Sequence, residues 1–274
     1  MDGELKALRV EIDEGVAEVT LLGPGKGNAM GPELWEELPD VFDDLDRDPE
    51  VRAIIVRGSG DHFTYGLDLN AMMANLAPHL MGEQTAAPRT QLGELIRELQ
   101  SAVDALEDCR KPVIAAVHGW CIGGGVDLIA ACDIRLCSGN AQFSVREVKL
   151  GIVADLGSLQ RLPRIIGQGA TRELAFTGAD IDAVRAHLMG LVNEVYSSND
   201  ALFQGAREMA REIAKNPPLV VQGIKQVMNY SADRPIEDGL EYVAVWNSAF
   251  LQSYDLAEAL AAFAEKREPE FKGE

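Results

Sequence analysis

The stretch between residues 112 and 163 constrains the fold of this chain more than any other. It opens with a short apolar run rich in β-branched residues at 113–117, which predicts a buried strand. Three consecutive glycines follow at 123–125, directly before an apolar segment at 126–132 that predicts a buried helix. Glycines before a helix let the backbone approach a ligand closely and leave N–H groups free to bind it. This turn is therefore a candidate ligand site.

Three carboxylates interrupt this otherwise apolar stretch. Asp127 lies just inside the predicted helix, Glu147 follows the next predicted strand, and Asp155 stands eight residues later among aliphatic side chains. An ionised carboxylate is costly to bury without a partner, so three of them here predict a site that uses acids. Taken singly, each acid could instead cap a helix or form an ion pair, and Asp155 could cap a helix that begins at Leu156.

The order and spacing of several motifs resemble the crotonase (enoyl-CoA hydratase/isomerase) superfamily over nearly the whole chain. Together, Asp127, Glu147 and Asp155 resemble its Δ3,5-Δ2,4-dienoyl-CoA isomerase branch. The resemblance implies an α/β crotonase fold, a spiral of ββα turns with a helical C-terminal oligomerisation region. It divides the chain into a spiral core with the acyl-CoA site at 1–198 and a helical trimerisation region at 199–274. The motifs beyond the stretch above are GNAM at 27–30, HFTYGLDL at 62–69, VQGIK at 221–225 and AVWNSAFLQSYD at 244–255.

An oxyanion hole is also implied by the resemblance. Its first donor would be the backbone N–H of Leu67, and its second the N–H of Gly124. Two donors aimed at a thioester oxygen stabilise the enolate that forms when an α-proton leaves, and losing one donor typically costs about 2.7–4 kcal/mol of barrier. Taken singly, Gly66 and Gly124 could be ordinary turn glycines.

Further residues are implied to contact an acyl-CoA substrate. The loop at 23–32 would lie along the adenine end of coenzyme A, with Lys26 beside a phosphate. It matches neither a P-loop nor a Rossmann fingerprint, and alone it could be a plain strand-to-helix connection. Phe263 and Lys266 of a neighbouring subunit would help to enclose the coenzyme, although they could equally be a core aromatic and a solvated lysine. The implied substrate-binding residues are Lys26, Asn28, Ala29, Tyr65, Gly66, Asp68, Leu69, Gly125, Phe263 and Lys266.

The implied reaction is a proton transfer along a conjugated acyl chain. A 3,5-dienoyl thioester loses a proton from carbon 2, and the enolate is protonated at carbon 6 to leave the 2,4-diene. One carboxyl must be ionised and another protonated, which burial can arrange by separating their pKa values. We expect Asp155 to be the base, Glu147 the acid and Asp127 a supporting group, with the first two roles open to reversal. No cofactor is implied, because coenzyme A is part of the substrate.

Enoyl-CoA hydration is the alternative. Hydratases of the superfamily hold one water between two glutamates, at the positions of Asp127 and Glu147, and usually carry glycine at the position of Asp155. Aspartate is one methylene shorter than glutamate, and an ångström-scale misplacement can cost about a hundredfold in rate. A carbon–carbon isomerase of another acyl chain and a non-catalytic acyl-CoA binding member remain open as well.

The composition indicates the class of protein and limits the partners that it can bind. Hydrophobic residues make up 47% and charged residues 25%, which is ordinary for a globular protein. The net charge of −19 disfavours nucleic acid and anionic membranes, because both bind clustered Lys and Arg. The cysteines lack CxxC spacing and the histidines lack a metal motif, which favours free thiols and no metal site. With no leader or long apolar run recognisable, we expect a cytoplasmic protein, and the resemblance implies a trimer or hexamer.

Periodicity predicts the remaining elements. Alternating residues at 8–12 and 16–22 predict a β-hairpin, and 51–56 predicts a buried strand. Two prolines and small polar residues at 75–88 predict a mobile loop over the acyl pocket, followed by an amphipathic helix at 90–109. Later segments predict helices at 170–176 and 182–188, a strand at 191–195, and helices at 201–215, 218–230, 235–247 and 255–266.

Overall fold

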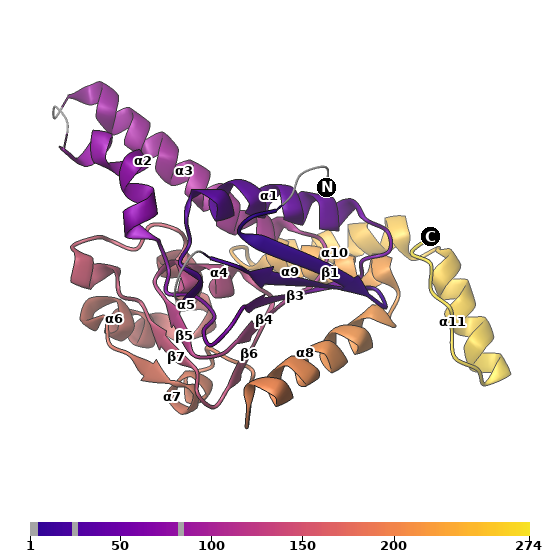
Figure 1. Ribbon diagram of the computed structural model, residues 1–274. Helices are drawn as coiled ribbons and strands as arrows, with labels where there is room; N and C mark the ends of the chain where they lie inside the picture. Colours follow the sequence, from indigo (N-terminus) through magenta and orange to yellow (C-terminus); the bar gives the residue numbers. More distant parts are fainter. Residues whose placement is uncertain (1–4, 24–26, 82–84) are drawn as a thin grey trace.

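The structure is a computed structural model that describes residues 5–23, 27–81 and 85–274 (Figure 1). Within them, one sheet has the strand order β1-β2-β3-β4-β6-β9, and a smaller one has the order β5-β7-β8. β1 and β2 pair antiparallel as the predicted hairpin, and the later pairs of the large sheet are parallel. The strands are β1 Leu8–Asp13, β2 Val16–Leu21, β3 Ala53–Gly58, β4 Val113–Val117, β5 Trp120–Ile122, β6 Ile134–Ser138, β7 Gln142–Ser144, β8 Ile181–Asp182 and β9 Glu194–Tyr196.

The predicted strands and C-terminal helices are confirmed within a few residues at each end. One prediction is wrong: the segment at 75–88, expected as a loop, is helical over most of its described residues. Pro88 is tolerated because it falls in the first turn of its helix, where a missing N–H has no partner to lose. The helices are α1 Pro32–Arg47, α2 Leu69–Met81, α3 Ala86–Asp108, α4 Gly124–Ala131, η2 (3₁₀) Glu147–Leu150, α5 Ser158–Ile165, α6 Gly167–Thr177, α7 Ala183–Leu188, α8 Asn199–Ala214, α9 Pro218–Ser231, α10 Ile236–Phe250 and α11 Tyr254–Glu265.

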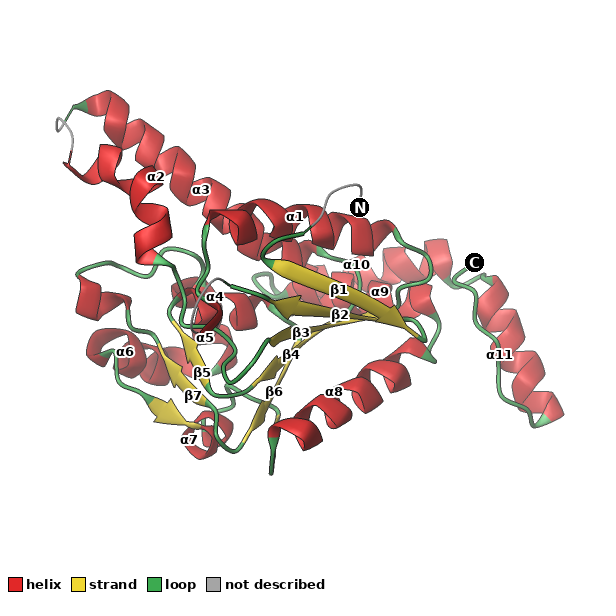
Figure 2. Ribbon diagram, in the orientation of Figure 1, coloured by secondary structure: helices red, strands yellow, loops and turns green. Residues whose placement is uncertain are grey.

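Helices cover both faces of the large sheet (Figure 2). Ile54 and Val56 of β3 point into a core shared with α1 and α3, whereas Ala53 and Ile55 point into a second core under α8. This division follows from the two-residue period of a strand. Parallel strands that are covered on both faces consist of continuous apolar runs. For this reason the central strands could be predicted from the sequence.

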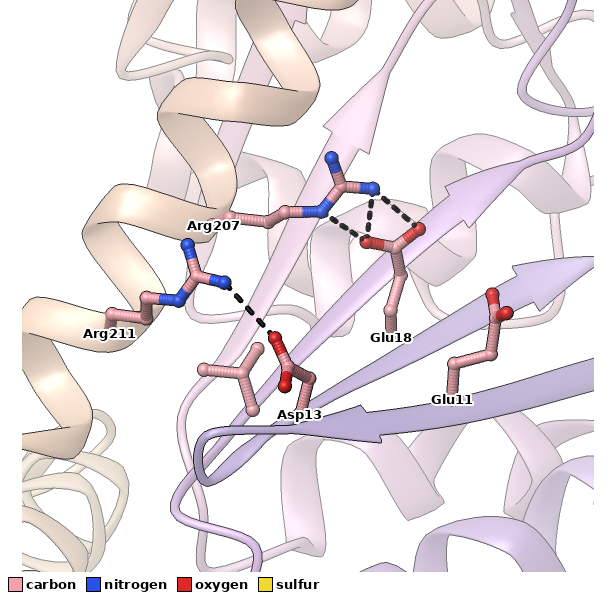
Figure 3. Close-up of a pocket in the computed structure, with 6 residues that line it drawn as sticks. Glu11, Asp13, Glu18, Arg207 and Arg211 are labelled. Carbon is pink, nitrogen blue, oxygen red and sulfur yellow. Dashed lines mark hydrogen bonds and ion pairs between the residues drawn. The ribbon is translucent and has the colours of Figure 1, made fainter.

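An ionic contact fastens α8 to the sheet (Figure 3). Glu18 on β2 accepts hydrogen bonds at 2.9 Å from Arg57 of β3 and from Arg207 of α8. Arg211, one turn further along α8, pairs with Asp13 at the end of β1. The Glu18 carboxylate is largely buried, so its bonds fix geometry more firmly than the exposed Asp13 pair does.

A buried lysine joins the C-terminal helices to the core. Lys225 of α9 donates to the backbone oxygens of Leu106 and Lys111 at 3.2 Å and to the Asp133 carboxylate at 2.8 Å. The domain boundary expected at 198/199 falls before α8, whose alanine face packs on the sheet with the core. That division stays a prediction.

In the part of the chain that the structure describes, no helix combines the length and apolar character needed to cross a bilayer.

Replacing Lys225 with methionine is expected to lower the free energy of unfolding by about 2–3 kcal/mol. The change leaves the Asp133 carboxylate and two carbonyl oxygens without their cation. Urea denaturation measures the loss. The matched control is Lys215→Met at the exposed end of α8, where a change within about 0.5 kcal/mol is expected. Equal midpoints for the two variants would mean that Lys225 does not anchor α9.

Candidate active site

A cavity of about 720 Å³ opens between the α2–α3 pair and the segment that follows β7. One wall is apolar and consists of leucine and isoleucine side chains from the two helices. Glu147 and Asp155 also line the cavity. The apolar wall comprises Leu69, Leu76, Leu92, Leu95, Ile96 and Leu99. Such a shape suits a ligand with an apolar chain and one polar, reactive end.

The two predicted oxyanion donors, Leu67 and Gly124, both line this cavity. Met30 bonds the residues on either side of Leu67, which leaves the Leu67 N–H without a hydrogen bond among the described residues. Gly124 is the first residue of α4, where a helical N–H has no intrahelical partner. Both N–H groups are therefore free to bind a ligand oxygen.

Two glycines allow these loops to meet. Gly66 has a φ of +79°, and a Cβ there would lie 2.5 Å from the carbonyl oxygen of Ile122. A Cβ on Gly125 would lie 2.4 Å from the side chain of Thr64. Any larger residue at either position would push apart the segments that carry the two donors. Gly66 and Gly125 thus act through backbone packing.

Glu147, at the start of η2, is the acid with the most distinctive surroundings. Its Oε2 is buried and has no hydrogen-bond partner among the described residues. Its Oε1 would lie 3.2 Å from a Cβ on Gly123, the residue before the oxyanion donor Gly124. Burial raises the pKa of Glu147 to about 7, and the charges of Asp127 and Asp155 contribute to the rise. The carboxyl can therefore exchange a proton near neutral pH.

Asp155 is half-buried in the irregular segment between η2 and α5. Burial raises the pKa of its carboxyl above the ordinary value. Its backbone oxygen accepts a hydrogen bond of 2.6 Å from Gln100 of α3. Asp155 thus lines the cavity and has its backbone held by α3.

Asp127 does not line the cavity. It is only 1% exposed, and its Oδ1 accepts a hydrogen bond of 2.6 Å from the backbone N–H of Ser158, at the start of α5. Burial raises the pKa of Asp127 to about 6, although the bond from Ser158 offsets part of the rise. Asp127 is therefore a buried acid outside the cavity lining, and its supporting role stays a prediction.

Several residues predicted to bind substrate have other tasks. The buried Asn28 side chain donates to the carbonyl oxygens of Ser59 and His62 at 2.8 Å, so it braces two loops. Asp68 caps α2 by accepting from the N–H of Ala71 at 3.0 Å. Tyr65, Gly66 and Leu69 line the cavity, whereas Ala29 and Gly125 lie outside its lining, and Lys26 lies outside the described residues.

Phe263 and Lys266 also lie away from this cavity within one chain. Both belong to the end of α11, which projects from the opposite side of the molecule (Figure 1). Phe263 is 85% exposed. A contact with coenzyme A would need a second copy of the chain, as the resemblance implied.

Sequence reasoning missed two sets of cavity residues. The wall from α3 follows a helical period at Leu92, Leu95 and Leu99 and belonged to a predicted amphipathic helix, so the signal was present but was not connected with the acyl pocket. Arg146 and Trp120 line the cavity from neighbouring strand ends, with the guanidinium 5.5 Å from the ring centroid. Their separation in sequence gave no signal for that contact.

Glu147→Gln is expected to stabilise the fold at alkaline pH. Because the folded state favours the protonated acid, ionisation costs stability as pH rises from the ordinary pKa of 4.5 through about 7. The amide removes this cost and should raise Tm at about pH 8.5 by roughly 5–10 °C, with little change at about pH 4.5. Scanning calorimetry measures the difference. Exposed Glu98→Gln is the control, and an equal gain at both pH values would contradict the assignment.

The chain matches the enoyl-CoA hydratase/isomerase family over residues 11–274. It is 45% identical to a mitochondrial Δ(3,5)-Δ(2,4)-dienoyl-CoA isomerase of Dictyostelium discoideum, over 98% of this chain and 92% of that protein. A peroxisomal Δ(3,5)-Δ(2,4)-dienoyl-CoA isomerase of Arabidopsis thaliana is 44% identical, over 97% and 96%. The crystal structure of an enoyl-CoA hydratase from Bacillus anthracis superposes with a TM-score of 0.89 at 30% identity, over 98% and 100%.

The expected cytoplasmic location is wrong, since these relatives are named mitochondrial and peroxisomal proteins. Receptors read short address segments rather than the composition of a folded domain, so the overall composition was no guide to the compartment. The predicted fold is confirmed by the structural match, which extends over 98% of the chain. On the family match and these relatives together, the chain belongs to the enoyl-CoA hydratase/isomerase family, the crotonase superfamily.

Proposed function

We propose that this protein isomerises 3,5-dienoyl-CoA thioesters to 2,4-dienoyl-CoA thioesters. The observation that carries the proposal is that Glu147 and Asp155 both line the cavity, whereas Asp127 lies behind them. A proton relay along an acyl chain needs two acids on one apolar cavity beside an oxyanion hole. The relatives at 44–45% identity are named as isomerases of this reaction, which supports the proposal.

In this proposal the thioester oxygen accepts hydrogen bonds from the N–H groups of Leu67 and Gly124. Removal of the proton from carbon 2 then places negative charge on that oxygen, where both donors strengthen their bonds. Tyr65 and Leu69 line the same cavity and are candidate contacts for the thioester arm. The apolar side chains of α3 would receive the acyl chain.

Glu147 is proposed as the base at carbon 2. Carbon 2 is bonded to the thioester carbon, so its proton must lie close to the oxyanion donors. Glu147 packs against Gly123, directly before the donor Gly124, and so lies at that end of the cavity. A pKa of about 7 leaves a large share of the carboxyl ionised at neutral pH. This order reverses the roles first expected from the sequence, which had left both orders open.

Asp155 is proposed as the acid at carbon 6. Its backbone is bonded to α3, the helix whose aliphatic side chains would receive the acyl chain, so we assign it to the carbon that lies further from the thioester. Burial raises the pKa of its carboxyl above the ordinary value, although a hydrogen bond from its own backbone N–H offsets part of the rise. The reaction moves protons without oxidation or reduction, so the proposal includes no cofactor besides the coenzyme A of the substrate.

The position of Asp127 favours isomerisation over hydration. A hydratase must hold a water between two carboxyls that face the substrate. Here the Oδ1 of Asp127 already binds the Ser158 N–H, and the side chain does not line the cavity. A non-catalytic binding protein would have no use for two acids whose burial in the acyl site is unfavourable.

Self-association and metabolic role extend the proposal. Large apolar side chains of α9 to α11 are exposed in a single chain, among them Met228, Leu240 and Leu260. Exposed apolar surface on this scale suits an oligomer interface, and we propose a trimer or a pair of trimers formed by residues 199–274.

Conversion of dienoyl-CoA thioesters would serve the β-oxidation of unsaturated fatty acids.

The variants Glu147→Gln and Asp155→Asn test the two roles. Both should slow the appearance of ultraviolet absorbance from the 2,4-diene by about 10²–10⁴-fold, the usual contribution of a general acid or base. In D₂O, exchange at carbon 2 should be lost in Glu147→Gln and retained in Asp155→Asn. Nuclear magnetic resonance of the recovered substrate measures this exchange.

Exposed Glu94→Gln on α3 is the control and should keep the wild-type rate. The opposite exchange pattern would contradict the assigned roles but keep the isomerase. Hydration of a 2-enoyl-CoA by the wild type, without turnover of the diene, would replace the proposal with the hydratase alternative. Binding of both thioesters without turnover of either would favour a non-catalytic member.

A further inference from the structure

Asp155 lies in a segment that has no regular secondary structure of its own. Residues 152–157, between η2 and α5, are neither helix nor strand. A carboxyl on such a segment can transfer a proton efficiently only if its backbone is held by other elements. The contacts that hold it therefore matter to the reaction.

Two hydrogen bonds from different helices hold this segment. Gln100 of α3 donates its Nε2 to the backbone oxygen of Asp155 at 2.6 Å. At the end of the segment, the Ser158 N–H donates to Asp127 of α4, also at 2.6 Å. The first anchor holds the peptide of Asp155 itself and the second holds the end of the segment three residues later, and neither binds the Asp155 carboxyl.

The choice of a backbone acceptor has a chemical consequence. An amide bonded directly to the Asp155 carboxylate would stabilise the ionised form and lower the pKa of that acid. Gln100 binds the carbonyl oxygen instead, so it fixes the peptide without competing for the proton. Of the two polar atoms of the Gln100 amide, only Nε2 can donate this hydrogen bond, because the amide oxygen Oε1 accepts and cannot donate.

Gln100 also belongs to the helix that lines the acyl cavity. Its neighbour Leu99 and the preceding residues Leu95 and Ile96 line the cavity wall. Arg161 of α5 pairs with Asp104 and fastens the same helix to the far end of the Asp155 region. The helix on which an acyl chain would pack is thus the helix that sets the position of the acid.

We infer that Gln100 is a positioning residue that holds Asp155 at the reacting carbon through its backbone oxygen. The inference rests on the proposed isomerisation and adds to it a residue outside the three carboxyls and the oxyanion hole. Gln100 touches neither the reacting atoms nor a carboxyl oxygen. Its effect should therefore appear in the step that uses Asp155 and leave the step at carbon 2 intact.

The test compares Gln100→Met, which keeps the length of the side chain and removes the donor, with the wild type in the full chain. With a 3,5-dienoyl-CoA substrate, kcat should fall about 10–100-fold, because an ångström-scale misplacement costs up to about a hundredfold. KM should change little, and carbon 2 should still exchange with D₂O. Ser101→Ala, on the exposed side of α3, is the control and should keep the wild-type kcat.

A second variant, Gln100→Glu, separates positioning from simple packing. A protonated glutamic acid can donate to the Asp155 oxygen, whereas the carboxylate cannot. The ratio of kcat in Gln100→Glu to kcat in Gln100→Met should therefore rise as pH falls. The charged groups that bear on this region are the Asp155 carboxyl itself, Asp127, Glu147, Arg161, Asp104 and Glu107, and they are the same in both variants.

Three kinetic results would overturn the inference. They are a Gln100→Met kcat within twofold of the wild type, a parallel loss of carbon 2 exchange, and a constant ratio between the two variants. Crystal structures of the wild type and Gln100→Met give a readout that does not depend on substrate. An unmoved Asp155 would overturn the inference by itself. If the wild type turns over no 3,5-diene, the proposed function fails, and the displacement of Asp155 alone then decides the role of Gln100.

Discussion

The close approach of three backbone segments is the constraint on which the rest of the site depends. Met30 bridges to Leu67, and Thr64 bridges to Cys121, so the loops that carry the two oxyanion donors are joined as if they were strands. The buried side chain of Asn28 and the hydroxyl of Thr64, which donates to the Asn28 oxygen at 2.6 Å, satisfy backbone groups at this junction. The neighbouring polar groups are hydrogen-bonded to one another. The N–H groups of Leu67 and Gly124 are therefore the ones that remain available to bind a ligand.

Burial performs two tasks at this site. The aliphatic wall that would receive an acyl chain is also the low-dielectric surrounding that raises the pKa values of Glu147 and Asp155. A carboxyl that can donate or accept near neutral pH is unfavourable for folding above its pKa, so the site costs stability. Ion pairs remote from the cavity, such as Lys225 with Asp133 and Glu18 with Arg207, can offset this loss of folding free energy.

Sequence patterns predicted those parts of the molecule that follow from local periodicity. The hairpin, the buried strand at 113–117 and the C-terminal helices have regular apolar spacing, and the structure contains them. Proline and glycine content gave a wrong prediction at 75–88, because helix packing outweighs the local penalty there. The capping role of Asp68 had a local signal, an aspartate just before a helix, and could have been found.

Contacts between distant segments could not be predicted from spacing. The partners of Asn28 lie more than thirty residues away, and the bond from Gln100 to Asp155 spans 55 residues. The three acids were recognised as a set, yet only the fold separates Asp127, which caps α5, from the two that face the cavity. Phe263 and Lys266 lie at the exposed end of α11, away from the cavity, and the contact predicted for them stays a prediction.

Charge placement around Glu147 shows how the site can be acidic and still work on an anionic thioester. Arg146 directly precedes Glu147, and a cation turned toward that carboxyl would lower its pKa. Instead, the guanidinium pairs with Asp180 and lies over the ring of Trp120. The positive charge is thereby kept at the cavity wall, away from the acid, and the pKa of Glu147 stays at about 7. A proton-transfer site in a chain with a net charge of −19 thus depends on where each cation is directed.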